Sequence, residues 1–183
     1  SIAVQLMNAF MNAAHKKQAL ELFSPYFQDY IKALVHFLGT DDPEVIGPAA
    51  AGVGIAVRIQ GAAVFEAAAP KLCKALQKPE CQNCQEEDWQ EATCDLVLAV
   101  LQGLDVAPQV APQVLPLVLG LLPIGGDLDK CQEVYERLVG LHSAGNPVIL
   151  QWPHLKQLAS VLLDTPLMLT EGTKEKLRAI VHG

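Results

Sequence analysis

Apolar residues between positions 114 and 141 follow two patterns with a break between them. Positions 114–122 are apolar almost throughout, which is typical of a helix that neighbours cover on several sides. Pro123 and the glycines at 125 and 126 end this pattern, and Asp127 can cap a second helix. Over positions 128–141, apolar residues recur every three or four places, with acidic residues on the opposite side. The segment therefore predicts a helical hairpin of one buried and one amphipathic helix, which needs neighbours to cover its apolar surface.

Similar apolar segments and breaks extend over the whole chain. Further helices are predicted at 2–23, 25–38, 44–59, 64–76, 86–104, 153–163 and 171–181. The first of these has one apolar face, formed by Ile2, Leu6, Ala9, Phe10 and Ala13. In the helix at 44–59, the glycines at 52 and 54 leave little side chain and predict a close contact with another helix.

The helices come in pairs, and the pairs recur along the chain. Comparable points in the first helix of each pair are Tyr30, Pro70, Pro116 and Pro153, at separations of 40, 46 and 37 residues. This spacing is typical of HEAT-type helical arrays. We therefore expect an all-α fold, an α-α superhelix (HEAT-repeat solenoid) of about four helix pairs plus a terminal cap helix, as one array over residues 1–183. A compact helical bundle without true repetition is the alternative.

Composition fits a single helical domain. The 183 residues are 51% hydrophobic and 5% aromatic, which is enough for a sizeable core. The β-branched residues do not form the alternating runs expected of strands. Prolines at 108, 112, 116 and 123 interrupt the longest uncharged apolar stretch, so we expect no membrane span. Because a helical pattern follows Ser1 at once, we expect the chain to be a fragment of a longer protein.

The cysteines include one pair with metal-ligand spacing. Cys81 and Cys84 form a CQNC motif, which is found in zinc and redox sites. Cys73 and Cys94 are the only nearby candidates for further ligands, and both lie in apolar helical patterns that suit buried thiols. We therefore predict no structural zinc and no cofactor, and cysteine usage that suits a reducing intracellular compartment.

No set of residues predicts catalysis. The five histidines lie far apart in sequence and match no metal-binding or triad motif. The glycines at 52, 54, 125 and 126 follow no strand and precede no GK[ST], so they do not form a phosphate-binding loop. The sequence therefore predicts a protein that is not an enzyme.

Negative charge is concentrated in the middle of the chain. The net charge is −7, yet residues 79–136 contain one Lys or Arg against eleven Asp and Glu. Six acidic residues are predicted on the outer faces of two equivalent, neighbouring helices: Glu87, Glu91, Asp95, Asp129, Glu133 and Glu136. Like charges on adjacent helices repel, so this arrangement favours a binding surface for a basic protein segment. A solvated face without a partner is the alternative, and direct nucleic-acid binding is disfavoured because phosphate needs a basic surface.

Three stretches resemble the C-terminal end of the karyopherin-β (importin-β) nuclear transport receptors. They are, at 24–55, 122–150 and 169–183, SPYFQDYIKALVHFLGTDDPEVIGPAAAGVGI, LPIGGDLDKCQEVYERLVGLHSAGNPVIL and LTEGTKEKLRAIVHG. The likeness is closest to the branch that carries ribosomal proteins and histones. One departure is Ile46, which follows DDPEV where the family commonly has an arginine. We therefore expect the ladder of polar side chains along the repeats to be broken at this point.

The resemblance implies a non-catalytic function in nuclear import. It implies that basic cargo, such as histone or ribosomal-protein segments, binds an acidic inner face of the solenoid. It further implies that the Ran GTPase binds a preceding N-terminal part, that nucleoporins are possible partners, and that the protein moves between cytoplasm and nucleus. The alternative function is a HEAT-repeat scaffold that organises a multiprotein complex without carrying cargo.

Overall fold

The computed structural model describes residues 2–17, 21, 23–82, 85–165 and 169–183. All regular structure in these residues is helical and none of them lies in a strand, so the predicted all-α class is confirmed. The α-helices are α1 (Ile2–Lys16), α2 (Phe27–Phe37), α3 (Pro43–Gln60), α4 (Ala62–Leu76), α5 (Pro79–Gln82), α6 (Glu87–Leu104), α7 (Ala111–Gly120), α8 (Leu128–Ser143), α9 (Pro147–Leu150), α10 (Leu155–Leu163) and α11 (Glu171–His182). Short 3-10 helices, η2 (Ser24–Tyr26) and η3 (Pro108–Val110), precede α2 and α7.

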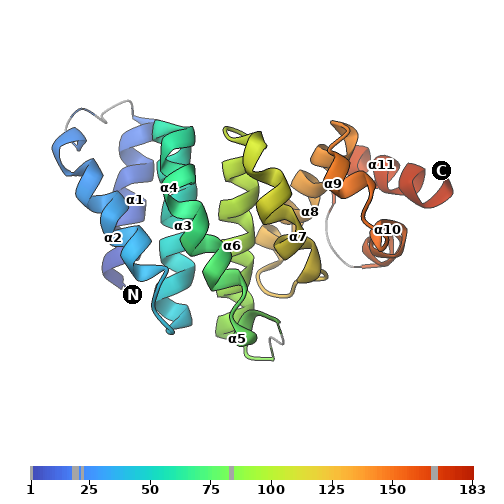
Figure 1. Ribbon diagram of the computed structural model, residues 1–183, viewed down its shortest axis with the longest axis horizontal. Coiled ribbons are helices and arrows are strands. Elements are labelled where there is room, and N and C mark those ends of the chain that lie inside the picture. Colours follow the sequence, from blue (N-terminus) through green and yellow to red (C-terminus); the bar gives the residue numbers. More distant parts are fainter. Residues whose placement is uncertain (1, 18–20, 22, 83–84, 166–168) are drawn as a thin grey trace.

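The helices lie in two rows that follow the chain from one end of the molecule to the other (Figure 1). In the first row, α1 packs on α3, α3 on α6, and α6 on α8. In the second row, α2 packs on α4 and α4 on α7, while α2 also covers α3 and α4 also covers α6. At the C-terminal end, α11 packs on both α8 and α10. The core therefore extends between the rows along the length of the molecule.

Helix starts follow local capping chemistry. The Asp42 carboxylate accepts a hydrogen bond from the backbone N–H of Glu44 at 3.0 Å, and the Asp127 carboxylate accepts one from Lys130 at 3.0 Å. Such bonds satisfy donors that the first helical turn leaves free. The cap predicted at Asp127 is thus confirmed. No helix in the described ranges is long and apolar enough to cross a membrane.

Helix α3 lies at the centre of the core and contacts α1, α2, α4 and α6. A Cβ atom added at Gly52 would lie 2.6 Å from both Asn8 Oδ1 and Leu34 Cδ2, and one added at Gly54 would lie 2.1 Å from Gln102 Oε1. These distances are far below van der Waals contact, so a larger residue at either position would have to displace the ends of these side chains. The close contact predicted at Gly52 and Gly54 is therefore confirmed.

Helix α6 is not the amphipathic surface helix that its sequence pattern predicts. Every residue from 92 to 101 is buried, because α3, α4, α7 and α8 all pack around this helix. A helix surrounded in this way has no solvent-facing side along its middle, so the predicted free acidic face exists only near its N-terminus.

Helix α1 also presents a different face from the one that its apolar pattern suggests. The side chains that face the core are Val4, Asn8, Met11 and Ala14. The predicted apolar face points outward, with Ile2, Leu6 and Phe10 exposed by 76%, 54% and 61%. In its row, α1 packs mainly on α3, and among the described residues no other helix of this row covers its opposite side. The predicted extension of this helix to residue 23 includes residues 18–20 and 22, which lie outside the described residues.

Candidate binding site at an acidic edge

The first turns of four helices meet at one edge of the molecule. A hollow of about 340 Å³ is lined by Ile2 and Gln5 of α1, Glu44 of α3, Asp88 and Glu91 of α6, and Lys130 of α8, among others. Each of these residues lies near the N-terminus of its helix. The helices of the first row therefore run in the same direction, and their N-termini share this edge.

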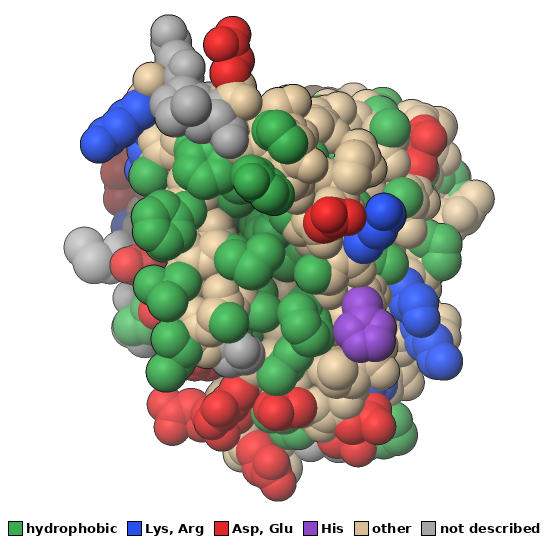
Figure 2. Space-filling model, turned by 90° about the vertical axis from the view of Figure 1, so that its left-hand side faces the viewer, with side chains coloured by type: hydrophobic (Ala, Val, Ile, Leu, Met, Phe, Trp, Pro, Cys, Tyr) green, Lys and Arg blue, Asp and Glu red, His purple; other side chains and the backbone are tan. Residues whose placement is uncertain are grey.

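This shared edge explains where the negative charge lies. The helices α3, α6 and α8 all carry acidic side chains in their first turns, and α3 and α8 have aspartate caps as well. A carboxylate at a helix N-terminus is favourable by about 0.3 to 1 kcal/mol, because the helix dipole leaves partial positive charge there. Acidic side chains gather along the lower border of the molecule in Figure 2. Part of the acidity therefore stabilises the helices, whatever else it does.

Three of the six predicted site residues come together at this edge: Glu87, Glu91 and Asp129. All three are exposed and line one hollow of about 640 Å³ between the starts of α6 and α8. We call this hollow the acidic groove, and its lining residues are Gln85, Glu87, Gln90, Glu91, Gly126, Asp127, Leu128 and Asp129. Sequence reasoning identified Asp127 only as a helix cap, although its position beside Asp129 at the start of a helix was a signal for the groove too.

Asp95, a fourth predicted site residue, is buried and does not reach the groove. It is only 8% exposed, and its Oδ1 atom lies 2.8 Å from Lys130 Nζ. Burial raises the pKa of the Asp95 carboxyl, although the hydrogen bond and the charge of Lys130 act against this. The prediction that Asp95 faces solvent is wrong, because α3 and α8 cover this side of α6.

Glu133 belongs to a chain of polar contacts that joins successive helices of the first row. Its Oε1 atom accepts hydrogen bonds from Gln102 Nε2 at 3.1 Å and from Arg137 Nε at 2.9 Å. Arg58 Nη1 donates to Gln102 Oε1 at 3.1 Å, and Arg137 Nη1 donates to Asp105 Oδ2 at 2.6 Å. We call these five residues the polar ladder. Burial raises the pKa of Glu133, but the hydrogen bonds from Arg137 and Gln102 outweigh it and hold this pKa below its usual range.

The polar ladder also shows where polar contacts join successive helices of the first row. Ile46, the residue expected to interrupt a ladder, is fully buried. The polar contact from α3 to the next helix of the row, α6, is made instead by Arg58, near the C-terminal end of α3.

Glu136 connects α8 to the start of the last helix. Its Oε1 atom accepts hydrogen bonds from Gln132 Nε2 at 3.2 Å and from the backbone N–H of Thr170 at 3.3 Å. Thr170 is the cap of α11 and accepts a bond from the backbone N–H of Thr173. Glu133 and Glu136 are therefore only partly exposed, and their carboxylates bond to neighbouring elements. Of the six predicted site residues, only Glu87, Glu91 and Asp129 line the groove.

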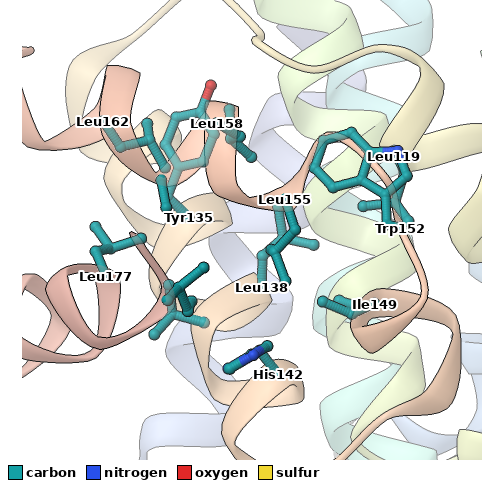
Figure 3. A pocket seen from close by; sticks show the side chains of 13 residues that line it. Leu119, Tyr135, Leu138, His142, Ile149, Trp152, Leu155, Leu158, Leu162 and Leu177 are labelled. Carbon is teal, nitrogen blue, oxygen red and sulfur yellow. The ribbon is translucent and has the colours of Figure 1, made fainter. Parts of the chain in front are cut away.

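A small apolar hollow lies at the C-terminal end, where α7, α8, α9, α10 and α11 converge (Figure 3). Its lining residues include Leu119, Tyr135, Trp152 and Leu177, together with the imidazole of His142. Its volume is about 20 Å³, roughly the space of one water molecule. This space is too small for an organic ligand.

The described residues were also compared with the requirements of a metal site. It contains no group of three or more His, Cys, Asp and Glu side chains that could hold a metal ion. Cys81 is buried in α5 and donates to the carbonyl of Ala75 at 3.4 Å, while Cys84, the second cysteine of the CQNC motif, lies outside the described residues. The acidic groove, by contrast, offers several carboxylates to ammonium or guanidinium groups.

Comparison with protein families, curated proteins and solved structures finds no match, so the karyopherin-β resemblance stays a prediction.

Proposed function

We propose that the chain is part of a HEAT-type helical array and that its acidic groove binds Lys- and Arg-rich segments of other proteins. The observation that carries this proposal is the gathering of exposed Glu87, Glu91 and Asp129, from two neighbouring helices, around one open hollow. The capping aspartate of α8, Asp127, adds a fourth carboxylate to the lining. No cation within the described residues forms an ion pair with these four side chains. A basic segment would supply the missing counter-charge.

The arrangement of the helices supports an array. Successive members of the first row contact one another in chain order, as do those of the second row. Stacked helix pairs of this kind form the extended binding surfaces of solenoid proteins. The polar ladder connects three consecutive members of the first row, which would hold their spacing as a partner binds.

The strength of such binding depends on several contacts acting together. An exposed ion pair contributes about 0 to 1 kcal/mol, and a micromolar complex needs about 8 kcal/mol. Charge alone from four carboxylates is therefore insufficient, and a bound segment would also use the amides of Gln85 and Gln90, which line the groove. Since the carboxylates are exposed, binding should weaken as salt is added.

The biological setting that we propose is nuclear import, on the strength of the karyopherin-β resemblance. In this setting the basic segment is cargo, such as a histone or ribosomal-protein tail, carried between cytoplasm and nucleus. Ran would act on another part of the receptor. The alternative is a scaffold that holds a basic subunit in a stable complex. Release of the bound tail by Ran-GTP from the full-length protein would favour the first, and its absence would favour the second.

The groove can be tested with charge reversal at Glu87, Glu91 and Asp129 together. A fluorescently labelled histone-tail peptide is titrated at low salt, and its anisotropy gives the dissociation constant. We expect at least tenfold weaker binding, about 1.4 kcal/mol. Asp95 and Glu133 are left unchanged, because their reversal would disturb the fold through Lys130 and the polar ladder.

The matched control is charge reversal at Glu21, Asp164 and Glu175, three exposed acidic residues outside the groove. It changes the net charge of the protein by the same amount. Equal affinity of the two triple variants would show that the peptide senses only net charge, and the acidic groove would then have no binding role.

A further inference from the structure

Two buried cysteines meet across the contact between α6 and α8. Cys94 of α6 has no exposed surface, and Cys131 of α8 is 3% exposed. Both are free thiols, and a side-chain hydrogen bond joins them, in which Cys94 donates to the Cys131 sulfur. Burial raises the pKa of the Tyr135 hydroxyl to about 12, and the two sulfur atoms, which both lie near this hydroxyl, add to the rise. The thiols therefore form one cluster in the core.

An ion pair between the adjacent residues supports the same register of the two helices. Asp95, next to Cys94, places its Oδ1 atom 2.8 Å from the Nζ atom of Lys130, which is next to Cys131. Residues 94 and 95 of α6 thus lie opposite residues 130 and 131 of α8. A disulfide requires two cysteines that already lie close together, because its geometry tolerates little movement of the backbone. The packing of α6 on α8 meets this requirement.

The surroundings make the two thiols unequal. The hydrogen bond from Cys94 lowers the pKa of Cys131, and the charge of Lys130 acts in the same direction, against the effect of burial. The same hydrogen bond and burial raise the pKa of Cys94. Since the thiolate is the reactive form of cysteine, Cys131 is the thiol that reacts first and Cys94 the one that reacts second.

The turn before α8 gives a route from the surface to Cys131. The Cys131 thiol lies 4.0 Å from the carbonyl oxygen of Ile124 in this turn. Ile124 also lines a hollow of about 330 Å³, and its neighbours Pro123 and Gly125 are exposed. The turn has no regular secondary structure, so its local opening requires no helix to unfold. Such an opening suits a small oxidant and excludes a bulky one such as oxidised glutathione.

We propose that Cys94 and Cys131 form a redox site that a small hydroperoxide, such as hydrogen peroxide, closes to a disulfide between α6 and α8. This inference does not rest on the proposed function of the acidic groove, because the bond forms whether or not a basic segment binds there.

The reaction proceeds in two steps. The Cys131 thiolate attacks one oxygen of hydrogen peroxide, which breaks the O–O bond and leaves a sulfenic acid on Cys131 and a hydroxide ion. Cys94 then loses its proton, and its sulfur attacks the Cys131 sulfur and displaces a second hydroxide. The protons of the two thiols convert both hydroxides to water. Two thiols and one peroxide therefore give one disulfide and two water molecules, with two electrons passing from sulfur to oxygen.

The test treats the folded, reduced protein with hydrogen peroxide, blocks the remaining thiols and maps the cysteine peptides by mass spectrometry. We expect the Cys94 and Cys131 peptides to be joined, at least tenfold more than either is joined to another cysteine, and to separate with dithiothreitol. Oxidation should also move the midpoint of urea unfolding to higher urea, because the bond closes the loop between the two helices. Cys131→Ser should abolish both effects. Cys73→Ser, which removes a half-buried thiol elsewhere, should preserve them.

The order of the two steps can be tested with single variants. Cys94→Ser keeps a hydrogen-bond donor beside Cys131 but cannot form the disulfide, so the sulfenic acid on Cys131 should accumulate and react with dimedone. Cys131→Ser should give at least tenfold less dimedone adduct, on Cys94. Equal labelling of the two variants would overturn the proposal. So would pairing of Cys94 or Cys131 with a different cysteine, or a bond between them that forms only after the protein is unfolded in urea.

Discussion

Single residues decide how closely the helices of this molecule approach one another. Gly103 shows this most clearly, since a Cβ atom there would lie 2.1 Å from the Phe65 ring, a side chain with no exposed surface. A ring packed on all sides has nowhere to move. By contrast, a Cβ atom at Gly140 of α8 would meet no atom within 4 Å. Two glycines inside helices therefore have opposite structural roles.

We predict that Gly103→Ala destabilises the protein by about 1 to 3 kcal/mol, through overpacking against Phe65. Gly140→Ala is the control and should stabilise it by about 0.5 to 1 kcal/mol, because alanine favours a helix where space is free. Urea unfolding followed by circular dichroism measures both. A Gly103→Ala variant as stable as Gly140→Ala would contradict the close α4–α6 packing.

At the scale of elements, polar side chains fix the register of neighbouring helices. The polar ladder joins α3, α6 and α8 through Arg58, Gln102 and Glu133, and Arg137 closes it on Asp105. Its contacts are partly exposed, so their energetic contribution is modest. Their geometry nevertheless requires each helix to hold one position along its neighbour.

The polar ladder predicts a pH dependence centred on Glu133. Its pKa is lower in the folded protein than its ordinary 4.5, so its charge stabilises the fold above that value. This stabilisation is lost as the pH falls through the lowered pKa. Glu133→Gln should therefore destabilise the protein at neutral pH, by about 0.5 to 1 kcal/mol for an exposed pair, and have little effect in acid.

Urea unfolding at both pH values measures this difference. Glu175→Gln on α11 is the control, since it removes an exposed carboxylate that makes no ion pair among the described residues, and it should have little effect at either pH. If Glu133→Gln were equally destabilising in acid, hydrogen-bond geometry and not the charge would account for its contribution.

Over the whole molecule, burial is uneven from the centre to the ends. Helix α6 contacts members of both rows, whereas α1 contacts one neighbour in its row and exposes a long apolar stripe. If each helix pair is stabilised mainly by its neighbours, as in stacked helical arrays, stability is close to a sum of contributions from each pair and its contacts. The ends should therefore open more often than the centre.

We predict that backbone amides of α6 exchange with deuterium most slowly and those of α1 and α11 much faster. Hydrogen exchange followed by mass spectrometry measures this helix by helix. Equal protection along the chain would indicate one cooperative unit, and the end helices would then be as firmly held as the centre.

Local sequence determined most of the long helices and many of their limits, but not the end of α1 at Lys16 or the short helices α5 and α9. Prolines, glycines and capping aspartates act within a few residues of themselves, so the breaks near Gly61 and Asp127 could be predicted without the fold. The close contact at Gly52 and Gly54 was also predictable, because a missing side chain leaves space in any packing. The acidic groove was predictable in part, since Glu87, Glu91 and Asp129 lie at helix starts, where charge remains in solvent.

Tertiary structure alone decided which side of each helix is covered. The apolar pattern of α1 placed Leu6 and Phe10 on one apolar face, yet those side chains are exposed because, among the described residues, no helix covers that side. The acidic pattern of α6 placed Asp95 in solvent, yet neighbouring helices bury it beside Lys130. The periodic pattern of a sequence indicates that a helix has an apolar and a polar side, but the number and position of its neighbours determine which side is buried. That information lies in contacts between residues far apart in the chain.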